Sequence, residues 1–279
     1  MKIGLIGGTG MEELLLGLAN LGDGGGSIKR AFEHVYGEEV CYSVLSIGSN
    51  TIYFIDRHHS LGDFLLPHQL IRRKAQQRYI YLLSKILGAR VVLATSAVGA
   101  IIGSANLDNP QVGEIYCPTD AIDYTGLPFT FADMLNQASV DFHRSMDDLF
   151  CHSLARLMVD VSKGGVSRKG ILGSTLQGPR FETRAEIDRY RKDGVDFLSM
   201  STCFPEAVLA REAGMSFGLL ACVTNLCPEA SAPLNGSQVK RAMKDQQLKL
   251  LQILLGTIDF LSTGGYLSGC DCRSFSSVL

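Results

Sequence analysis

The sequence lacks the features that mark several classes of protein. Its 279 residues carry a formal net charge of only -2, so no excess of positive charge is available to attract a nucleic acid or a membrane surface. No apolar run approaches the roughly 20 residues that cross a bilayer. The opening residues, M-K-I-G-L-I-G-G-T-G, are too short and too rich in glycine for a signal peptide. We therefore expect a cytoplasmic protein without a membrane or nucleic-acid partner.

The cysteine spacing that marks metal-binding and disulfide-rich proteins is also missing. The eight cysteines are scattered singly, except for Cys270 and Cys272, and no C-x-x-C pair is present. This distribution favours reduced intracellular thiols and predicts no metal site. All six histidines lie between His34 and His152, which excludes histidine chemistry from the chain beyond residue 152.

The N-terminal glycines do not form a dinucleotide-binding fingerprint. They occur at Gly4, Gly7, Gly8 and Gly10, not as G-x-G-x-x-G, and no acidic residue closes a clear second strand about 20 residues on. The tight turn still allows backbone N–H groups to approach a phosphate. A serine-histidine-acid motif and a P-loop lysine are absent as well, which leaves chemistry that depends on positioning.

Apolar runs alternate with amphipathic stretches, as in an α/β protein. Strands are expected within 2–6, 40–47, 51–56, 90–95, 113–124, 170–176, 195–198 and 217–224. Helices are expected at about 70–87, 147–162, 185–192, from Pro205 onward, and 237–255. No repeat or linker divides the chain. We predict one domain over residues 1–262, followed by a loose tail rich in Gly, Ser and Cys over 263–279.

Polar side chains follow six of these elements. They are Thr9, Arg57 with His58, Thr95 with Ser96, Glu182, Met200 with Ser201, and Thr224 with Asn225. Ligands of α/β sheets bind where strands end, so these groups could converge to hold an anion, a sugar and a planar base. The alternative is that each is an ordinary solvated connection.

At these residues the chain resembles the trimeric purine nucleoside phosphorylases, including the methylthioadenosine and methylthioinosine phosphorylases. The matching pieces are G-G-T-G, Arg57-His58, P-H-Q at Pro67, T-S-A-V-G at Thr95, D-Y-T at Asp123, G-P-R-F-E-T-R-A-E at Gly178, M-S-T…P-E at Met200 and T-N at Thr224. The resemblance implies a single α/β domain with a central mixed, partly closed sheet flanked by helices, assembled as a homotrimer. It implies phosphorolysis of a purine nucleoside, with inorganic phosphate as co-substrate and no cofactor or metal.

The resemblance also implies roles for individual residues. The catalytic residues would be Asn225, Glu182 and Ser201. The phosphate-binding residues would be Thr9, Arg57, His58, Thr95, Ser96, Ala97 and Ser201. The nucleoside-binding residues would be Val98, Gly99, Phe181, Glu182, Met200, Thr224 and Asn225.

The residues expected at the base favour a 6-oxopurine such as that of inosine or 5′-methylthioinosine. Asn225 can donate to O6 and accept from N7–H, and Glu182 can accept from N1–H. Near Gly236, Val239 and Met243, an apolar pocket would accept a 5′-methylthio group. Phosphorolysis of methylthioadenosine remains an alternative.

A catalytically silent relative that binds nucleosides also remains an alternative. Cys203 and Phe204 precede Pro205, one residue more than the usual pattern of the family. A displaced backbone at this point could impair the reaction.

Overall fold

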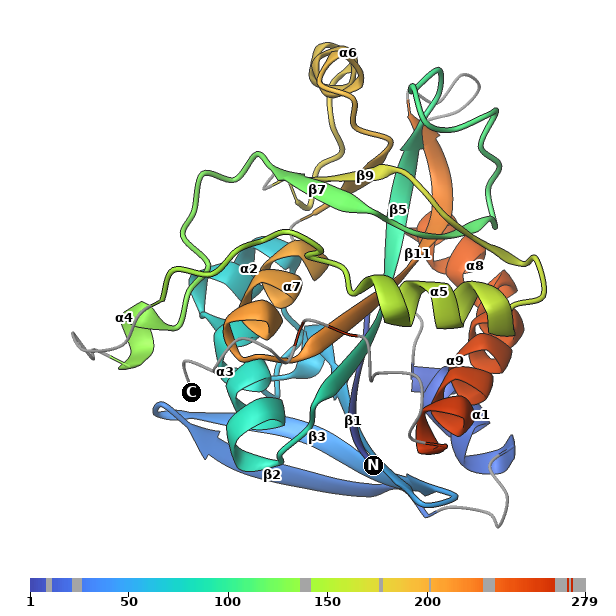
Figure 1. Ribbon diagram of the computed structural model, residues 1–279. Coiled ribbons are helices and arrows are strands. Elements are labelled where there is room, and N and C mark those ends of the chain that lie inside the picture. Colours follow the sequence, from blue (N-terminus) through green and yellow to red (C-terminus); the bar gives the residue numbers. More distant parts are fainter. Residues whose placement is uncertain are drawn as a thin grey trace.

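Two long apolar strands form the centre of the fold. β5 (Val91–Ile101) and β11 (Ser216–Cys227) run parallel along their whole lengths, and almost every residue of both is buried. Continuous apolar runs of this kind are typical of parallel strands covered on both faces. Figure 1 shows the pair crossing the middle of the molecule, with helices on either side.

The computed structural model describes residues 1–8, 12–21, 27–135, 142–175, 178–200, 202–227, 234–263, 270 and 272. Within these ranges one mixed sheet contains β5, β11 and nine further strands. The further strands are β1 (Lys2–Gly7), β2 (Lys29–Val35), β3 (Glu38–Ile47), β4 (Asn50–Asp56), β6 (Ile115–Cys117), β7 (Asp120–Asp123), β8 (Val166–Arg168), β9 (Ile171–Ser174) and β10 (Phe197–Ser199).

The order of the strands brings distant parts of the chain to one edge of the sheet. β4, β1, β5 and β11 are mutually parallel neighbours, with Gly7 opposite Asp56 and Ile6 opposite Ala94. The residues that follow β4 and β1 therefore emerge beside the middle of β5. β10 pairs antiparallel with the second half of β5, at Gly99 and Ala100, and brings its own end to the same region.

Helices cover both faces of the sheet. They are α1 (Glu12–Leu21), α2 (Pro67–Arg72), α3 (Ala75–Tyr81), α4 (Ala132–Leu135), α5 (His152–Val161), α6 (Arg184–Lys192), α7 (Cys203–Glu212), α8 (Gly236–Asp245) and α9 (Gln247–Ser262). A short 3₁₀ turn, η1, spans Arg57–His59, and a π-helical turn, η2, spans Leu82–Ile86.

Alternating side chains of the central strands feed two separate cores. Along β5, Val91 and Leu93 join the cluster that contains residues of α1, α5 and α9. Val92 and Ala94 join the cluster that contains residues of α3 and α7. This period of two is what a strand buried on both faces requires. The predicted α/β fold, with a central mixed sheet flanked by helices in a single domain, is confirmed.

Two long predicted helices are each divided. The helix expected over 70–87 breaks at Lys74, which adopts a left-handed conformation with φ of 49°, before α3 begins. The helix expected over 237–255 divides at Gln246 into α8 and α9. Neither break contains proline or glycine, so the sequence gives no local signal for it.

Some predicted elements have different limits. The region 113–124 contains two short strands, β6 and β7, and the helix expected from 147 begins at His152. The expected loose tail lies mostly outside the described residues. Of its members, Cys272 is buried in the core beside α5 and α9, and Cys270 packs against that core.

Candidate active site

A cavity of about 560 Å³ lies where the strand ends converge. Its volume is in the usual range for small-molecule sites. Its walls come from the ends of β1, β4 and β10, the middle of β5, the end of β11, the loop before α6, and α8. The lining includes eleven of the predicted site residues: Arg57, His58, Ser96, Ala97, Val98, Gly99, Phe181, Glu182, Met200, Thr224 and Asn225. The predicted convergence of these residues on one cavity is therefore found.

Arg57 is the cationic group at one end of the cavity, although only 1% of its surface is exposed. Its Nε donates to Oε1 of Glu206 over 2.6 Å, and Nη2 donates to Oε2 over 2.8 Å. Burial alone would lower the pKa of Arg57, but the charge of Glu206 outweighs burial and raises it. The guanidinium therefore remains charged at every pH at which the protein folds.

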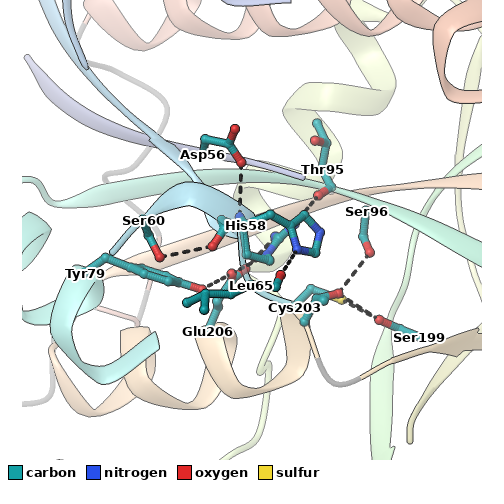
Figure 2. A network of polar contacts seen from close by, with 12 residues as sticks. Asp56, His58, Ser60, Leu65, Tyr79, Thr95, Ser96, Ser199, Cys203 and Glu206 are labelled. Carbon is teal, nitrogen blue, oxygen red and sulfur yellow. Dashed lines mark hydrogen bonds and ion pairs between the residues drawn. The ribbon is translucent and has the colours of Figure 1, made fainter. Parts of the chain in front are cut away.

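A third side chain holds Glu206 in place. The hydroxyl of Tyr79 donates to Oε1 of Glu206, and Figure 2 shows the two side chains directed toward each other from α3 and α7. Burial, followed by the charge of Glu206, raises the pKa of Tyr79 well above 10, so the phenol remains a donor. The carboxylate is thus fixed by two partners on different elements, and it fixes the plane of the guanidinium in turn.

The third nitrogen of Arg57 faces the N-terminal glycine turn. Nη1 donates to the carbonyl of Thr95 over 3.3 Å. A Cβ placed on Gly8 would lie 2.6 Å from Nη1 and 3.7 Å from Nε2 of His58. Because Gly8 has no side chain, its backbone can approach these two nitrogens, and all three residues border the cavity.

His58 presents a nitrogen with a lone pair beside Arg57. Nδ1 lies 2.7 Å from the carbonyl of Leu65, which can only accept, so Nδ1 carries the proton. Burial lowers the pKa of His58, which keeps the ring neutral near pH 7 and leaves Nε2 as an acceptor. Figure 2 shows this contact, and the ring of Phe64 stacks on His58 at 5.6 Å between centroids.

The hydroxyl groups of Ser96, Ser199 and Thr202 form a cluster. Oγ1 of Thr202 is 3.4 Å from Oγ of Ser96 and 3.1 Å from Oγ of Ser199. Ser96 and Thr202 border the cavity. Cys203, one of the two residues between Thr202 and Pro205 in the segment that is one residue longer than usual, is buried in the first turn of α7 with its sulfur 3.5 Å from Oγ of Ser199. The longer segment is accommodated as helix, and Glu206 still reaches Arg57.

A carboxylate, that of Glu182, also lines the cavity. Oε1 of Glu182 accepts a hydrogen bond of 2.8 Å from Oγ1 of Thr175. Thr183 caps α6 immediately after it through a reciprocal pair of bonds with Glu186, which fixes the backbone at Glu182. Burial raises the pKa of Glu182 from its ordinary value of 4.5.

Asn225 lines the same cavity from β11. Its Oδ1 accepts from Thr224 over 3.1 Å, and its Nδ2 donates to the sulfur of Cys227 over 3.3 Å. The pairing of β11 with β5 shifts by one residue between Val223 and Asn225, which turns this part of the strand. A Cβ on Gly99 would lie 2.9 Å from Nδ2 of Asn225, so the absence of a side chain at Gly99 leaves room for this amide.

Three predicted residues stand apart from this arrangement. Thr95 does not line the cavity: it is fully buried, and its Oγ1 has no hydrogen-bond partner among the described residues. Thr9 and Ser201 lie outside the described residues. The structure therefore brings Arg57, His58, Glu182 and Asn225 to one cavity, and it does not describe the hydroxyls of Thr9 and Ser201.

Sequence reasoning missed the residues that support Arg57. Glu206 and Tyr79 are both fully buried, and neither was assigned a role. An acidic residue inside the apolar run F-P-E-A-V-L-A is the one available signal for Glu206. Of the residues expected near a 5′ substituent, Gly236 and Val239 line the cavity, together with Lys240 and Lys244. Met243 instead is buried in the core.

Comparisons with known proteins identify the family. The profile of the Phosphorylase superfamily matches residues 2–259. A protein of Methanopyrus kandleri named as a probable S-methyl-5′-thioinosine phosphorylase is 33% identical over 227 residues, covering 80% of this chain and 78% of its own. The 6-oxopurine nucleoside phosphorylase of Pyrococcus furiosus is 30% identical, over 81% of this chain and 83% of its own.

Solved structures support the fold. The methylthioadenosine phosphorylase of Schistosoma mansoni in complex with adenine superposes with a TM-score of 0.78 at 20% identity, covering 94% of this chain and 92% of that chain. The match of the profile to nearly the whole chain, with relatives above 30% identity, shows that this chain belongs to the Phosphorylase superfamily.

Proposed function

We propose that the protein is a purine nucleoside phosphorylase that uses inorganic phosphate to cleave a 6-oxopurine nucleoside such as inosine or 5′-methylthioinosine. The products are the free base and ribose 1-phosphate or 5-methylthioribose 1-phosphate. The observation that carries the proposal is a single cavity lined by Arg57, His58, Glu182 and Asn225. Relatives named for both kinds of nucleoside support the substrate class.

The end with Arg57 suits a hydrogen phosphate ion. Glu206 occupies Nε and Nη2, so Nη1 is the edge of the guanidinium nearest Gly8 and the cavity. Nε2 of neutral His58 can accept from the single hydroxyl of HPO₄²⁻, and the hydroxyls of Ser96 and Thr202 can donate. Thr9 and Ser201, proposed from the resemblance, would add further donors.

The reaction forms one bond and breaks another. A phosphate oxygen bonds to C1′ of the nucleoside while the C1′–N9 bond breaks, and its electron pair moves onto the purine. The proton of HPO₄²⁻ is finally carried by the released base. The protein brings the anion to C1′ and stabilises negative charge on the leaving purine, which requires neither a covalent intermediate nor a cofactor.

Asn225 and Glu182 fit the leaving base of a 6-oxopurine. The carboxamide can donate to O6 and accept from N7–H, and the carboxylate can accept from N1–H. Adenine has no proton on N1 and would leave Glu182 without that partner. Phe181, Val98 and Gly99 provide apolar surface for the ring, and Met200 provides it for the ribose.

We assign the wall at α8 to the 5′ substituent. Val239 offers apolar surface there, as a methylthio group requires, but Lys240 and Lys244 also border the cavity. Phe64 stacks on His58 at the margin of the cavity and is 57% exposed. An exposed aromatic ring at this point would be covered in a homotrimer whose sites lie near subunit interfaces, which we propose as the assembly.

An assay of base release tests the function. The protein is incubated with inosine, methylthioinosine or methylthioadenosine, with and without inorganic phosphate. We expect release of hypoxanthine that requires phosphate, together with formation of a sugar 1-phosphate. Faster release of adenine from methylthioadenosine would instead favour the second candidate, a methylthioadenosine phosphorylase. Binding without release of any base would identify a silent relative and would contradict the proposal.

A further inference from the structure

Three cysteine thiols meet at a point that the proposed reaction does not use. The sulfur atoms of Cys151, Cys270 and Cys272 all lie within 4.8 Å of one another. Cys151 and Cys270 are 119 residues apart in the chain, yet their sulfurs are separated by 3.3 Å. Cys151 and Cys272 are buried, and Cys270 is half-buried. The remaining five cysteines are not part of any such group among the described residues.

The site is far from the cavity. The backbone N–H of Cys151 donates to the carbonyl of Phe217 over 2.8 Å, which fastens Cys151 to the start of β11. Asn225 lies eight residues beyond Phe217 along β11, and at the rise of an extended strand this is a distance of about 26 Å. The thiols therefore contact the opposite end of the strand that supplies Asn225.

We propose that Cys151, Cys270 and Cys272 form a binding site for a soft metal ion, Zn²⁺ or Cu⁺. Thiolate sulfur is the preferred protein ligand of both ions. Two thiolates that share a zinc ion are about 3.8 Å apart, given Zn–S bonds of about 2.3 Å in a tetrahedron. The three sulfurs approach one another to that order of distance without any rearrangement of the backbone.

Neighbouring side chains are compatible with such an ion. Oγ of Ser216 lies 3.4 Å from the sulfur of Cys270 and offers an oxygen near a fourth position, which zinc requires and Cu⁺ does not. The guanidinium of Arg211 lies near Cys272, where its positive charge can offset the negative charge of three thiolates around one ion. The ion would fasten Cys270 and Cys272 to the start of α5 and β11.

Metal titration tests the site directly. The protein is reduced, stripped with a chelator and titrated with Co²⁺, a coloured substitute for Zn²⁺, and separately with Cu⁺ against a chromophoric competitor. We expect one equivalent of ion per chain, with a thiolate-to-cobalt charge-transfer band in the Co²⁺ experiment. Displacement of Co²⁺ by Zn²⁺ would assign a zinc site, whereas Cu⁺ binding without the cobalt band would assign a copper site.

Single substitutions identify the ligands. Cys151→Ser, Cys270→Ser and Cys272→Ser should each lower the affinity by roughly 100-fold, while Cys41→Ser, a half-buried cysteine outside the group, should leave it unchanged. Bound ion should also raise the melting temperature of the native chain and of Cys41→Ser, but not that of Cys270→Ser. Cys270 is half-buried, so its substitution tests the site even where replacement of buried Cys151 prevents folding.

The proposal would be overturned by reduced protein that binds neither ion, or by variants that bind as well as the native chain. Conversion of the reduced thiols to a disulfide without metal uptake would overturn it as well. These results are separate from the proposed enzymatic function, because nucleoside cleavage is not the readout.

Discussion

Arg57 and Glu206, 149 residues apart in the chain, form a two-point ion pair that is almost completely removed from water. A buried pair of this kind gives little net stability, because the loss of hydration offsets the attraction between the charges. The pair matters more for the orientation of the guanidinium than for stability. With two nitrogens held by Glu206, and Glu206 held by Tyr79, the orientation of the guanidinium is fixed before any phosphate arrives.

Replacement of Glu206 should therefore affect both phosphate use and folding. In Glu206→Gln the guanidinium keeps a hydrogen-bond acceptor but loses its counter-charge. We expect the free energy of unfolding to fall by about 3 kcal/mol, as for a broken buried pair. We also expect kcat/KM for phosphate to fall by about 10- to 100-fold as the anion site loses its geometry. Denaturant unfolding and initial rates at varied phosphate measure the two effects.

Asp188→Asn is the matched control for loss of a carboxylate. Asp188 pairs with Arg191 on the surface, where its side chain is 59% exposed. Such pairs contribute at most about 1 kcal/mol, so stability should change little and phosphate kinetics should not change. Equal effects of the two substitutions would show that Glu206 has no special relation to phosphate.

Gly8→Ala tests how closely the N-terminal turn must approach Arg57. The new methyl group would lie 2.6 Å from Nη1, and Arg57 cannot move away because Glu206 holds it. We expect KM for phosphate to rise by about 10-fold or more, with a smaller change in KM for the nucleoside. Initial rates over a matrix of both substrate concentrations separate these constants.

Gly17→Ala provides the comparison for Gly8→Ala. Its methyl group would meet only the end of the flexible Leu251 side chain, at 2.8 Å, inside α1. Phosphate kinetics should match those of the native chain. An unchanged KM for phosphate in Gly8→Ala would place the anion elsewhere.

The pH dependence of base recognition should follow Glu182. Its pKa is raised by burial, so as pH falls the carboxylate takes up a proton at a higher pH than an ordinary glutamate with a pKa of 4.5. The protonated form loses acceptor strength toward N1–H. We therefore expect kcat/KM for inosine to decline on the acid side at a pH above 4.5, and this decline should disappear in Glu182→Gln, whose activity is lower at all pH values.

Thr175→Val should move that acid limb in a defined direction. The hydrogen bond from Thr175 favours the ionised carboxylate and lowers the pKa of Glu182, partly opposing burial. Without it the pKa rises further, so the decline in kcat/KM should begin at higher pH. A limb that stays in place, or moves to lower pH, would assign the titration to another group.

Asn225→Asp should change the choice of base. A carboxylate can accept from the exocyclic amine of adenine but can no longer donate to O6. We expect the ratio of inosine to adenosine activity to fall by about 10-fold. Asn235→Asp is the control, because Asn235 precedes the cavity residue Gly236 and caps α8 through its side-chain oxygen, which aspartate retains. A ratio that moves equally in both variants would contradict the assignment of Asn225.

The sequence predicted that the strand ends converge, but it did not predict that Glu206 pairs with the buried Arg57. The apolar runs before Arg57, Thr95 and Thr224 are strong strand signals, and parallel neighbours necessarily bring their ends to one edge. The burial of Arg57 could not be predicted, because a charged turn after a strand is usually solvated. Its counter-charge, Glu206, lies on α7, and only the three-dimensional packing brings the two together.

The sequence also did not predict where the long helices break. Gly88, in a left-handed conformation, marks the end of the helical region as expected, but the break at Lys74 has no residue that requires it. Tertiary packing decides there, since Ala75, Gln76 and Tyr79 turn inward directly after the break. Tyr79 thereby reaches Glu206, so a feature invisible in the sequence contributes to the site.

A crystal structure with phosphate and hypoxanthine tests the central claim most directly. We expect the phosphate within hydrogen-bonding distance of Nη1 of Arg57 and Nε2 of His58, and the base between Phe181 and the side chains of Glu182 and Asn225, both in the one cavity. Phosphate bound away from Arg57, or hypoxanthine bound outside the cavity, would contradict the account.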